Sequence, residues 1–137
     1  PAIICLVEHP DGDHCLLGRQ SHWPDGMYSV VAGFVEHGET LEECVIREVK
    51  EETGIIVAEV DYKASQPWPF PSSIMLGFFA KAQTEIFAPD DNELEDIRWV
   101  SRAELSTFGE MADLGNSFKL PNTWSISRRL IDSWRSK

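Results

Sequence analysis

The chain has 137 residues and a net charge of −11, from 23 acidic and 12 basic side chains. This length predicts one core, and we expect a single domain that covers residues 1–137. The excess of carboxylates argues against nucleic-acid binding through a broad basic surface as the main activity. No apolar run approaches about 18 residues, so we expect no membrane span.

The three cysteines are widely spaced and form no CxxC pair. We interpret Cys5, Cys15 and Cys44 as buried thiols of a reducing compartment. The predicted location is cytoplasmic, with the peroxisome or another organelle as the alternative. Because the first residue is Pro1 and not Met, we also expect a fragment or a processed form of a longer chain.

The first half of the chain predicts three strands and one helix. Residues 2–8 and 14–20 are predicted strands joined by the turn PDGD, and a third short strand is expected over 27–31. Apolar side chains then recur at three- and four-residue steps and predict a helix over 40–53. Thr40 and Glu43 form a capping box at its start, and Gly54 ends it.

The second half predicts more strands and a second long helix. Strands are expected over 55–64, 74–85 and 96–100, with a proline-rich segment interrupting the first two. A short helix is expected from Ser101, a loop over 107–122, and an amphipathic helix over 124–134. Strands mixed with two substantial helices on one core predict an α/β or α+β sandwich.

Glu48, Glu51 and Glu52 share one face of the predicted helix, because a helix turns by about 100° per residue. Their mutual repulsion requires a positive partner. Lys50 points away from this face, and Arg47 reaches only its edge. Mg²⁺ or Mn²⁺ fits the need, held by these carboxylates and by the phosphate oxygens of a substrate. The alternative is that the glutamates form only a solvated helix face.

Residues 33–55, GFVEHGETLEECVIREVKEETGI, fill every defined position of the Nudix box, GX5EX7REUXEEXGU, in which U is a bulky aliphatic residue. The matching residues are Gly33, Glu39, Arg47, Glu48, Val49, Glu51, Glu52, Gly54 and Ile55. The chain therefore resembles the Nudix hydrolases, which cleave a nucleoside diphosphate linked to another moiety. The resemblance implies the Nudix α/β/α sandwich with a mixed central sheet, and a salt bridge between Glu39 and Arg47 that pins a loop to the helix.

The resemblance also implies roles for the acidic residues of the box. Glu48, Glu51 and Glu52 are the expected catalytic residues and metal ligands. Of these, Glu48 and Glu52 hold the metal, and Glu51 or a neighbour prepares the attacking water. The carbonyl of Ala32, just before the box, is a further ligand position in related enzymes. The metal would neutralise the diphosphate and lower the pKa of bound water.

Residues 65–73, SQPWPFPSS, resemble the sequence SQPWPFPxS of the NADH pyrophosphatase branch of the Nudix family. Three prolines stiffen this segment, so that its Trp and Phe present flat surfaces to a ring at little entropic cost. The residues expected to bind substrate here are Gln66, Pro67, Trp68, Pro69, Phe70, Pro71, Ser72 and Ser73. The alternative is an edge segment whose aromatic side chains fill the core or form a dimer contact.

Three more residues match functional positions of that branch. Phe34 falls where the branch carries a ring that stacks on the nucleotide, with a buried core Phe as the alternative. Glu93 matches a downstream metal ligand, and Glu95 and Asp96 are its nearby rivals. Ser127 lies where an alanine next to the substrate is common, so a substrate contact is expected to differ there.

The resemblance implies hydrolysis of NADH or NAD⁺ to nicotinamide mononucleotide and AMP, with Mg²⁺ or Mn²⁺ as cofactor. Removal of NAD caps from RNA is a second candidate activity, because the same bond is cleaved. The branch acts as homodimers, so a homodimer is expected, and its full-length members carry an upstream domain and usually a zinc ribbon that these residues lack. The alternatives are hydrolysis of ADP-ribose or dinucleoside polyphosphates, a non-catalytic nucleotide-binding module, and a domain that holds a peptide.

Overall fold

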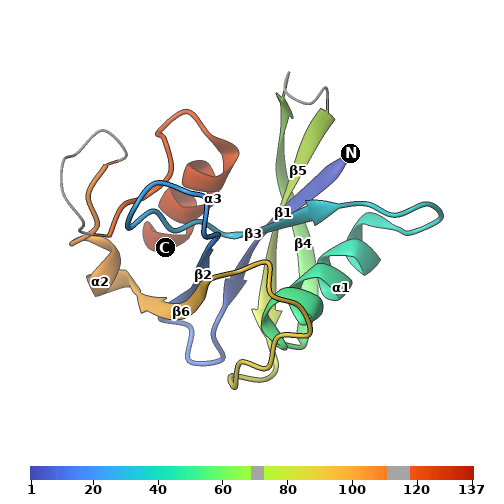
Figure 1. Ribbon diagram of the computed structural model, residues 1–137, viewed down its shortest axis with the longest axis horizontal. Helices are drawn as coiled ribbons and strands as arrows, with labels where there is room; N and C mark the ends of the chain where they lie inside the picture. Colours follow the sequence, from blue (N-terminus) through green and yellow to red (C-terminus); the bar gives the residue numbers. More distant parts are fainter. Residues whose placement is uncertain (69–72, 111–117) are drawn as a thin grey trace.

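A six-stranded mixed sheet lies between helices in the computed structural model, which describes residues 1–68, 73–110 and 118–137 (Figure 1). The strands are β1 (Ala2–Glu8), β2 (His14–Arg19), β3 (Val31–Phe34), β4 (Val57–Trp68), β5 (Ser73–Ala82) and β6 (Asp96–Ser101). The helices are α1 (Leu41–Thr53), α2 (Arg102–Leu105) and α3 (Ile126–Arg135). Among these helices none is long and apolar enough to cross a membrane.

The strand order is β4-β5-β1-β2-β6, and β3 also pairs with β1. β1 runs parallel to β5 and antiparallel to β2 and β3. β3 pairs with the first half of β1, from Ala2 opposite Phe34 to Cys5 opposite Val31, while β2 pairs with it at Glu8. The start of β1 is therefore flanked by β3 and β5, and these three strands form the floor of the site described below.

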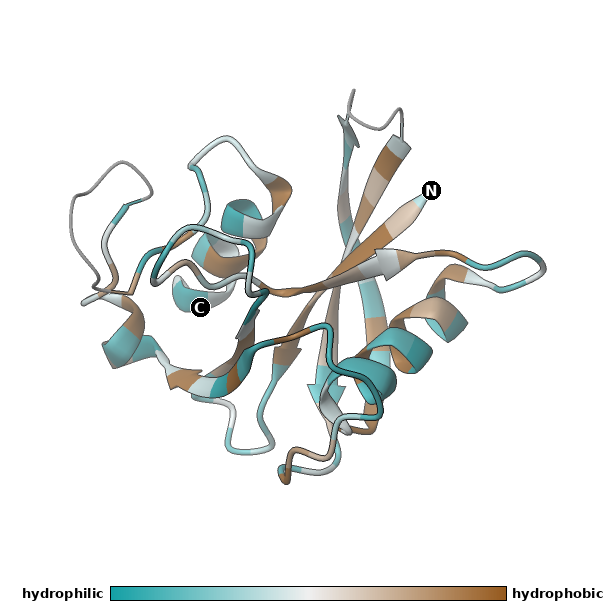
Figure 2. Ribbon diagram, in the orientation of Figure 1, coloured by the Kyte–Doolittle hydropathy of each residue, from teal (hydrophilic) through white to brown (hydrophobic). Residues whose placement is uncertain are grey.

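Alternate residues of β1 pack into two different cores. Ile3, Cys5 and Val7 are buried together with the apolar side chains of α1. Ile4 and Leu6 are buried on the opposite face, together with the apolar side chains of α3. Figure 2 shows the hydrophobic colouring along the central strands and the hydrophilic outer surface of α1. Helices cover both faces of the sheet, which confirms the predicted sandwich.

The predicted capping box starts α1. The side-chain oxygen of Thr40 accepts a hydrogen bond from the Glu43 amide at 3.1 Å, and the Glu43 carboxylate accepts one from the Thr40 amide at 2.8 Å. Gly54 ends the helix with a φ of 79°. The Gly54 backbone also lies against Ala88, whose amide donates to the Thr53 carbonyl at 2.9 Å. The end of α1 thus holds the segment that precedes β6.

The strand predicted over 27–31 is wrong, because β3 begins only at Val31. Residues 27 and 29 make only isolated bridges, to Lys119 and to Gly18. The reason is that Arg19 draws the backbone of this segment inward: its Nη1 donates to the carbonyls of Pro24 at 2.8 Å and Met27 at 3.3 Å.

The proline-rich segment does not interrupt the sheet where predicted, because β4 continues to Trp68. Gln66 pairs with Met75 and Pro67 with Ile74 across β4 and β5. Proline is tolerated here because β4 is an edge strand, where a missing amide donor faces no neighbouring strand. Register shifts break the β4–β5 pairing in two places, and Glu59 adopts a φ of 50° beside the first.

Two predicted boundaries also move. β5 ends at Ala82 and not at residue 85. α3 begins at Ile126 because the Ser125 hydroxyl caps it by accepting from the Arg128 amide at 3.2 Å, which leaves Trp124 outside the helix.

The cysteines are buried and free, as predicted. Burial raises the pKa of Cys15 to about 12 and that of Cys5 still further. Because the thiolate is the reactive form, these thiols have the character of packed hydrophobic side chains. The reducing compartment stays a prediction.

Gly54→Ala should lower the free energy of unfolding by about 3 kcal/mol, since a left-handed φ costs about 1 kcal/mol and overpacking adds more. The added Cβ would lie 2.4 Å from the Ala88 carbonyl oxygen. Gly12→Ala is the matched control, because Gly12 has a φ of 75° but no atom of the described residues would lie within 4 Å of an added Cβ. Urea unfolding measures both losses, and equal losses would contradict the role of the Ala88 contact.

Candidate active site

Glu48 projects from α1 directly onto the backbone of β3. A Cβ atom added at Gly33 would lie 2.2 Å from Cδ of Glu48 and 2.5 Å from its Oε2. No side chain larger than hydrogen fits at Gly33 while Glu48 keeps this position. The first glycine of the box is therefore explained by close packing, and it fixes the Glu48 carboxylate at the edge of β3.

Arg47 gathers the carboxylates of the box around one guanidinium. Its Nε donates to Glu39 at 2.6 Å, and its Nη1 donates to Glu48 at 2.8 Å and to Glu51 at 3.2 Å. The hydrogen bonds from Arg47 hold the pKa of Glu39 at about 2. The predicted bridge between Glu39 and Arg47 is confirmed. The expectation that Arg47 reaches only the edge of the acidic face is wrong, because its long side chain bends back over the helix.

Glu52 is the buried member of the acidic cluster. Glu52 is only 2% exposed, and among the described residues its Oε2 has no hydrogen-bond partner. Burial, contact with Glu93 and the charge of Glu48 together raise the pKa of Glu52 to about 9, and burial contributes most. Glu51, in contrast, is 42% exposed at its side chain. The three carboxylates thus have distinct surroundings on one helix.

Glu93 is the downstream acidic residue that faces this cluster. Glu93 contacts Glu52. The pKa of Glu48 is raised mainly by burial, and the charge of Glu93 raises it as well. The two rivals have other partners: Glu95 accepts from Arg19 at 2.6 Å, and Asp96 accepts from Arg98 at 2.6 Å. The geometry therefore favours Glu93 over its rivals, and its role as a ligand stays a prediction.

A cleft of about 450 Å³ opens beside the acidic cluster. Its lining residues are Ala2, Gln20, Ala32, Gly33, Phe34, Val35, Glu36, Glu48, Met75 and Glu93. Phe34 is 63% exposed, so the alternative of a buried core Phe is wrong. The cleft is lined by both an aromatic ring and carboxylates, which suits a ligand that has a flat ring and a charged linking group such as a diphosphate.

One row of paired residues crosses four strands at this end of the sheet, and its members on β3, β1 and β5 line the cleft. Phe34 on β3 is opposite Ala2 on β1, Ala2 is opposite Met75 on β5, and Met75 is opposite Gln66 on β4. Sequence reasoning did not select Ala2, Met75 or Gln20 as site residues. Met75 follows the proline-rich segment closely, but only the strand register could have identified the row.

Gln66 and Trp68 hold the start of α3. The Gln66 side chain donates to the Trp124 carbonyl at 2.9 Å and accepts from the Ile126 amide at 3.0 Å. Trp68 donates to Gln66 at 3.2 Å, and its ring centroid lies 5.5 Å from that of Trp124. These contacts use the hydrogen-bonding groups of Gln66 within the chain, so its substrate contact stays a prediction.

The other expected substrate residues are placed as follows. Pro67 lies in β4, and the Ser73 hydroxyl is buried without a hydrogen-bond partner in the part of the chain that the structure describes. Ser127 is buried at the start of α3, where its hydroxyl is hydrogen-bonded to that of Ser29. Pro69, Phe70, Pro71 and Ser72 lie outside the described residues.

A family model described as NUDIX domain matches residues 1–119. This chain belongs to the NUDIX domain family. The human protein named NAD-capped RNA hydrolase NUDT12 is 45% identical over an aligned length of 137 residues, and the alignment covers 98% of this chain and 29% of the human protein. The Mycobacterium bovis protein (strain BCG / Pasteur 1173P2) named NAD-capped RNA hydrolase NudC is 44% identical over 139 residues, covering 98% of this chain and 44% of NudC. The Nudix chain spans less than half the length of these relatives.

Solved Nudix structures share the fold. A NUDIX-family hydrolase from Clostridium perfringens has a TM-score of 0.75 at 16% identity, covering 98% of this chain and 95% of that one. The NUDIX domain of Shewanella oneidensis NrtR, complexed with ADP ribose, has a TM-score of 0.71 at 17% identity, covering 98% and 85%. These likenesses confirm the predicted fold.

Nudix hydrolases generally use divalent metal ions, and this acidic cluster fits one. The buried, unpartnered Oε2 of Glu52 lies beside further carboxylates, which is a donor set typical of hard divalent cations. In the described part of the chain, no three His, Cys, Asp or Glu side chains are already gathered into a ligand set. Arg47 pairs with Glu48 and Glu51 in this arrangement, so a bound cation would compete with the guanidinium for these two carboxylates.

Glu52→Gln should stabilise the Nudix domain in buffer that contains a chelator, by about 1–3 kcal/mol at pH 8. The folded-state pKa of about 9 lies above the ordinary 4.5, so the folded protein binds more protons between these values. Wild-type stability should therefore fall as the pH rises from about 4.5 to about 9, and the variant should lack this slope.

Glu51→Gln is the control for that measurement, because Glu51 is well exposed and should change stability by no more than about 0.5 kcal/mol. Thermal unfolding in EDTA across this pH range compares the three proteins. A glutamine variant at position 52 that is less stable than wild type at pH 8 would contradict the assignment of an uncompensated buried carboxylate.

Proposed function

We propose that this Nudix domain hydrolyses the diphosphate bond of NADH or NAD⁺, giving nicotinamide mononucleotide and AMP, with Mg²⁺ or Mn²⁺ as cofactor. The observation that carries the proposal is the shared cleft, in which Glu48 and Glu93 lie beside the exposed ring of Phe34. The SQPWPFPSS segment and the names of the relatives from human and Mycobacterium bovis support a dinucleotide as the substrate.

The acidic residues would hold the cofactor. Glu48, Glu52 and Glu93 supply carboxylates, with Glu51 and the Ala32 carbonyl as further ligands. When bound, a divalent ion neutralises the diphosphate and lowers the pKa of the attacking water. Glu48 already lines the cleft, and release of Glu51 from Arg47 would let the Glu51 carboxylate turn toward it, while Arg47 stays anchored to Glu39 by two hydrogen bonds.

The reaction forms one bond to phosphorus and breaks one. The oxygen of water attacks a phosphorus atom of the diphosphate, and the bond from that phosphorus to the bridging oxygen breaks. Glu51 is suited to accept the proton of the water, because it is the most exposed carboxylate of the helix cluster. Glu48 and Glu52 are held against β3 and in the core, which suits them to fixed roles.

The cleft would bind the substrate by its ring and by its charged bridge. Phe34 offers an exposed face to a flat ring, and Ala2 and Met75 extend this apolar floor toward Gln66. The diphosphate then lies at the end where Glu48 and Glu93 line the cleft. Trp68 and Ser73 are paired across β4 and β5, and Ser127 is buried at the start of α3.

NAD caps of RNA contain the same diphosphate bond, so we propose cap removal as a second activity of this site. The net charge of −11 disfavours contacts along an RNA body, and recognition would rest on the cap. We further propose that the protein acts as a homodimer in a reducing, cytoplasmic setting, in line with its free buried thiols.

Incubation with NADH, NAD⁺, ADP-ribose or NAD-capped RNA tests the proposal, with Mg²⁺, Mn²⁺ or EDTA and with the products identified by mass. We expect nicotinamide mononucleotide and AMP from the dinucleotides, and loss of turnover in EDTA. Glu52→Gln should reduce kcat/KM for NADH by about a hundredfold or more, because a ligand of the cofactor is removed.

Glu42→Gln is the matched control, since Glu42 lies exposed in the first turn of α1, away from the cleft, and should leave turnover unchanged. Full turnover by the Glu52 variant would refute the assignment of the acidic residues. A clear preference for ADP-ribose over NADH would contradict NADH as the substrate and favour the alternative of an ADP-ribose hydrolase. Binding without turnover would indicate a nucleotide-binding module.

A further inference from the structure

Arg19, the last residue of β2, is buried beside the loop that leads to β3. Its side chain is 9% exposed. The guanidinium donates to three backbone carbonyls of this loop: Nη2 to Trp23 at 3.2 Å, and Nη1 to Pro24 at 2.8 Å and Met27 at 3.3 Å. A single side chain therefore binds the carbonyls of residues 23, 24 and 27 in a segment that has little support from strand pairing.

The same side chain holds the segment that carries Glu93. Arg19 Nε donates to the Glu95 carboxylate at 2.6 Å, and the Arg19 carbonyl accepts from the Glu95 amide at 2.7 Å. Leu94 packs on Gly18, where an added Cβ would lie 2.9 Å from Leu94 Cδ1. Residues 94 and 95 are thus fixed to the end of β2, immediately after Glu93.

The two segments that Arg19 joins both face the acidic helix. Gln20 and Glu93 line the cleft together with Glu48. Trp23 and Leu94 line a smaller cavity together with Glu52. Arg19 lies behind this wall of the site, does not line the cleft, and connects its two halves through hydrogen bonds to each.

We propose that Arg19 is a positioning residue, which holds Glu93 toward Glu48 and Glu52 through Glu95 and the 20–27 loop. The proposal rests on the proposed function, in which Glu93 is a cofactor ligand. Lysine cannot replace Arg19, because one ammonium group cannot reproduce the planar fork that reaches a carboxylate on one side and several carbonyls on the other. Residues that orient ligands in this way typically alter metal affinity by about 10–100-fold when substituted.

A double-mutant cycle between Arg19→Lys and Glu93→Gln tests the proposal with two readouts. Mn²⁺ binding is titrated by the loss of the electron paramagnetic resonance signal of the free ion, and NADH hydrolysis gives kcat and KM. With Glu93 intact, Arg19→Lys should weaken Mn²⁺ binding by about tenfold and lower kcat more than it raises KM. With Glu93→Gln present, the same change should alter Mn²⁺ affinity less than about twofold.

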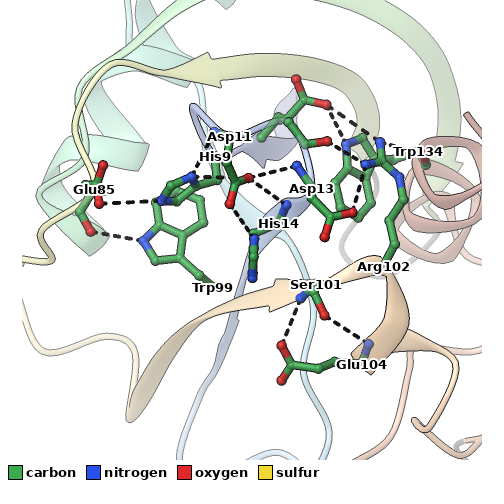
Figure 3. A network of polar contacts seen from close by, with 12 residues as sticks. His9, Asp11, Asp13, His14, Glu85, Trp99, Ser101, Arg102, Glu104 and Trp134 are labelled. Carbon is green, nitrogen blue, oxygen red and sulfur yellow. Dashed lines mark hydrogen bonds and ion pairs between the residues drawn. The ribbon is translucent and has the colours of Figure 1, made fainter.

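Arg102→Lys is the matched control for the loss of a structural arginine. Arg102 lies at the opposite end of β2, where it donates to the Gly12 carbonyl and its guanidinium lies 4.0 Å from the ring centroid of Trp134 (Figure 3). This variant should lower the melting temperature and leave Mn²⁺ affinity unchanged. Equal Mn²⁺ affinities of the Arg19 and Arg102 variants, or additive effects in the cycle, would overturn the proposal.

Glu95→Gln provides a second measurement if Arg19→Lys does not fold. The Glu95 side chain is 50% exposed, so its amide form should preserve the fold, yet the ion pair with Arg19 is lost. It should weaken Mn²⁺ binding in the same direction, and an unchanged affinity would also overturn the proposal. A protein that binds Mn²⁺ through Glu93 but does not hydrolyse NADH would contradict the proposed function and leave the role of Arg19 standing.

Discussion

The burial of a carboxylate on α1 is the constraint on which the rest of the site depends. Glu52 is almost completely removed from water, one of its oxygens has no hydrogen-bond partner among the residues that the structure describes, and Glu48 is pressed against β3. Such an arrangement costs folding free energy. It persists because the helix that carries it is capped at both ends, packed by Val45 and Val49, and joined at its last turn to the segment bearing Glu93.

Two arginines serve this acidic cluster in different ways. Arg47 contacts the carboxylates directly and anchors the box loop through Glu39. Arg19 contacts none of the helix carboxylates and ties together the two segments on the facing wall. Arg47 balances the negative charge of the carboxylates, while Arg19 binds backbone carbonyls and links the segment before β3 to the segment that follows Glu93. A site of this kind therefore needs rigid support from both the helix and the opposing wall.

Sequence reasoning succeeded where local chemistry determines structure. The caps at Thr40 and Gly54 follow from the residue types at the two ends of the helix, and the shared face of the carboxylates follows from helical spacing. It failed where contacts between distant residues determine the bounds of a strand. Arg19 binds backbone carbonyls of the segment before β3, so β3 begins later than predicted, and pairing with β5 extends β4 through Pro67. The floor residues Ala2 and Met75 depend on strand register between segments far apart in the chain, which no local pattern encodes.

The irregular course of β4 affects whether another chain can add a strand to this edge of the sheet. An outer strand with a regular, unshielded backbone would be a template onto which another chain could add. Here the pairing register shifts twice, Glu59 bends the backbone, and charged side chains such as Asp61 and Lys63 follow along the exposed stretch. A second copy of the chain is thus disfavoured from extending the sheet at this border, and self-association would have to use a surface built from side chains.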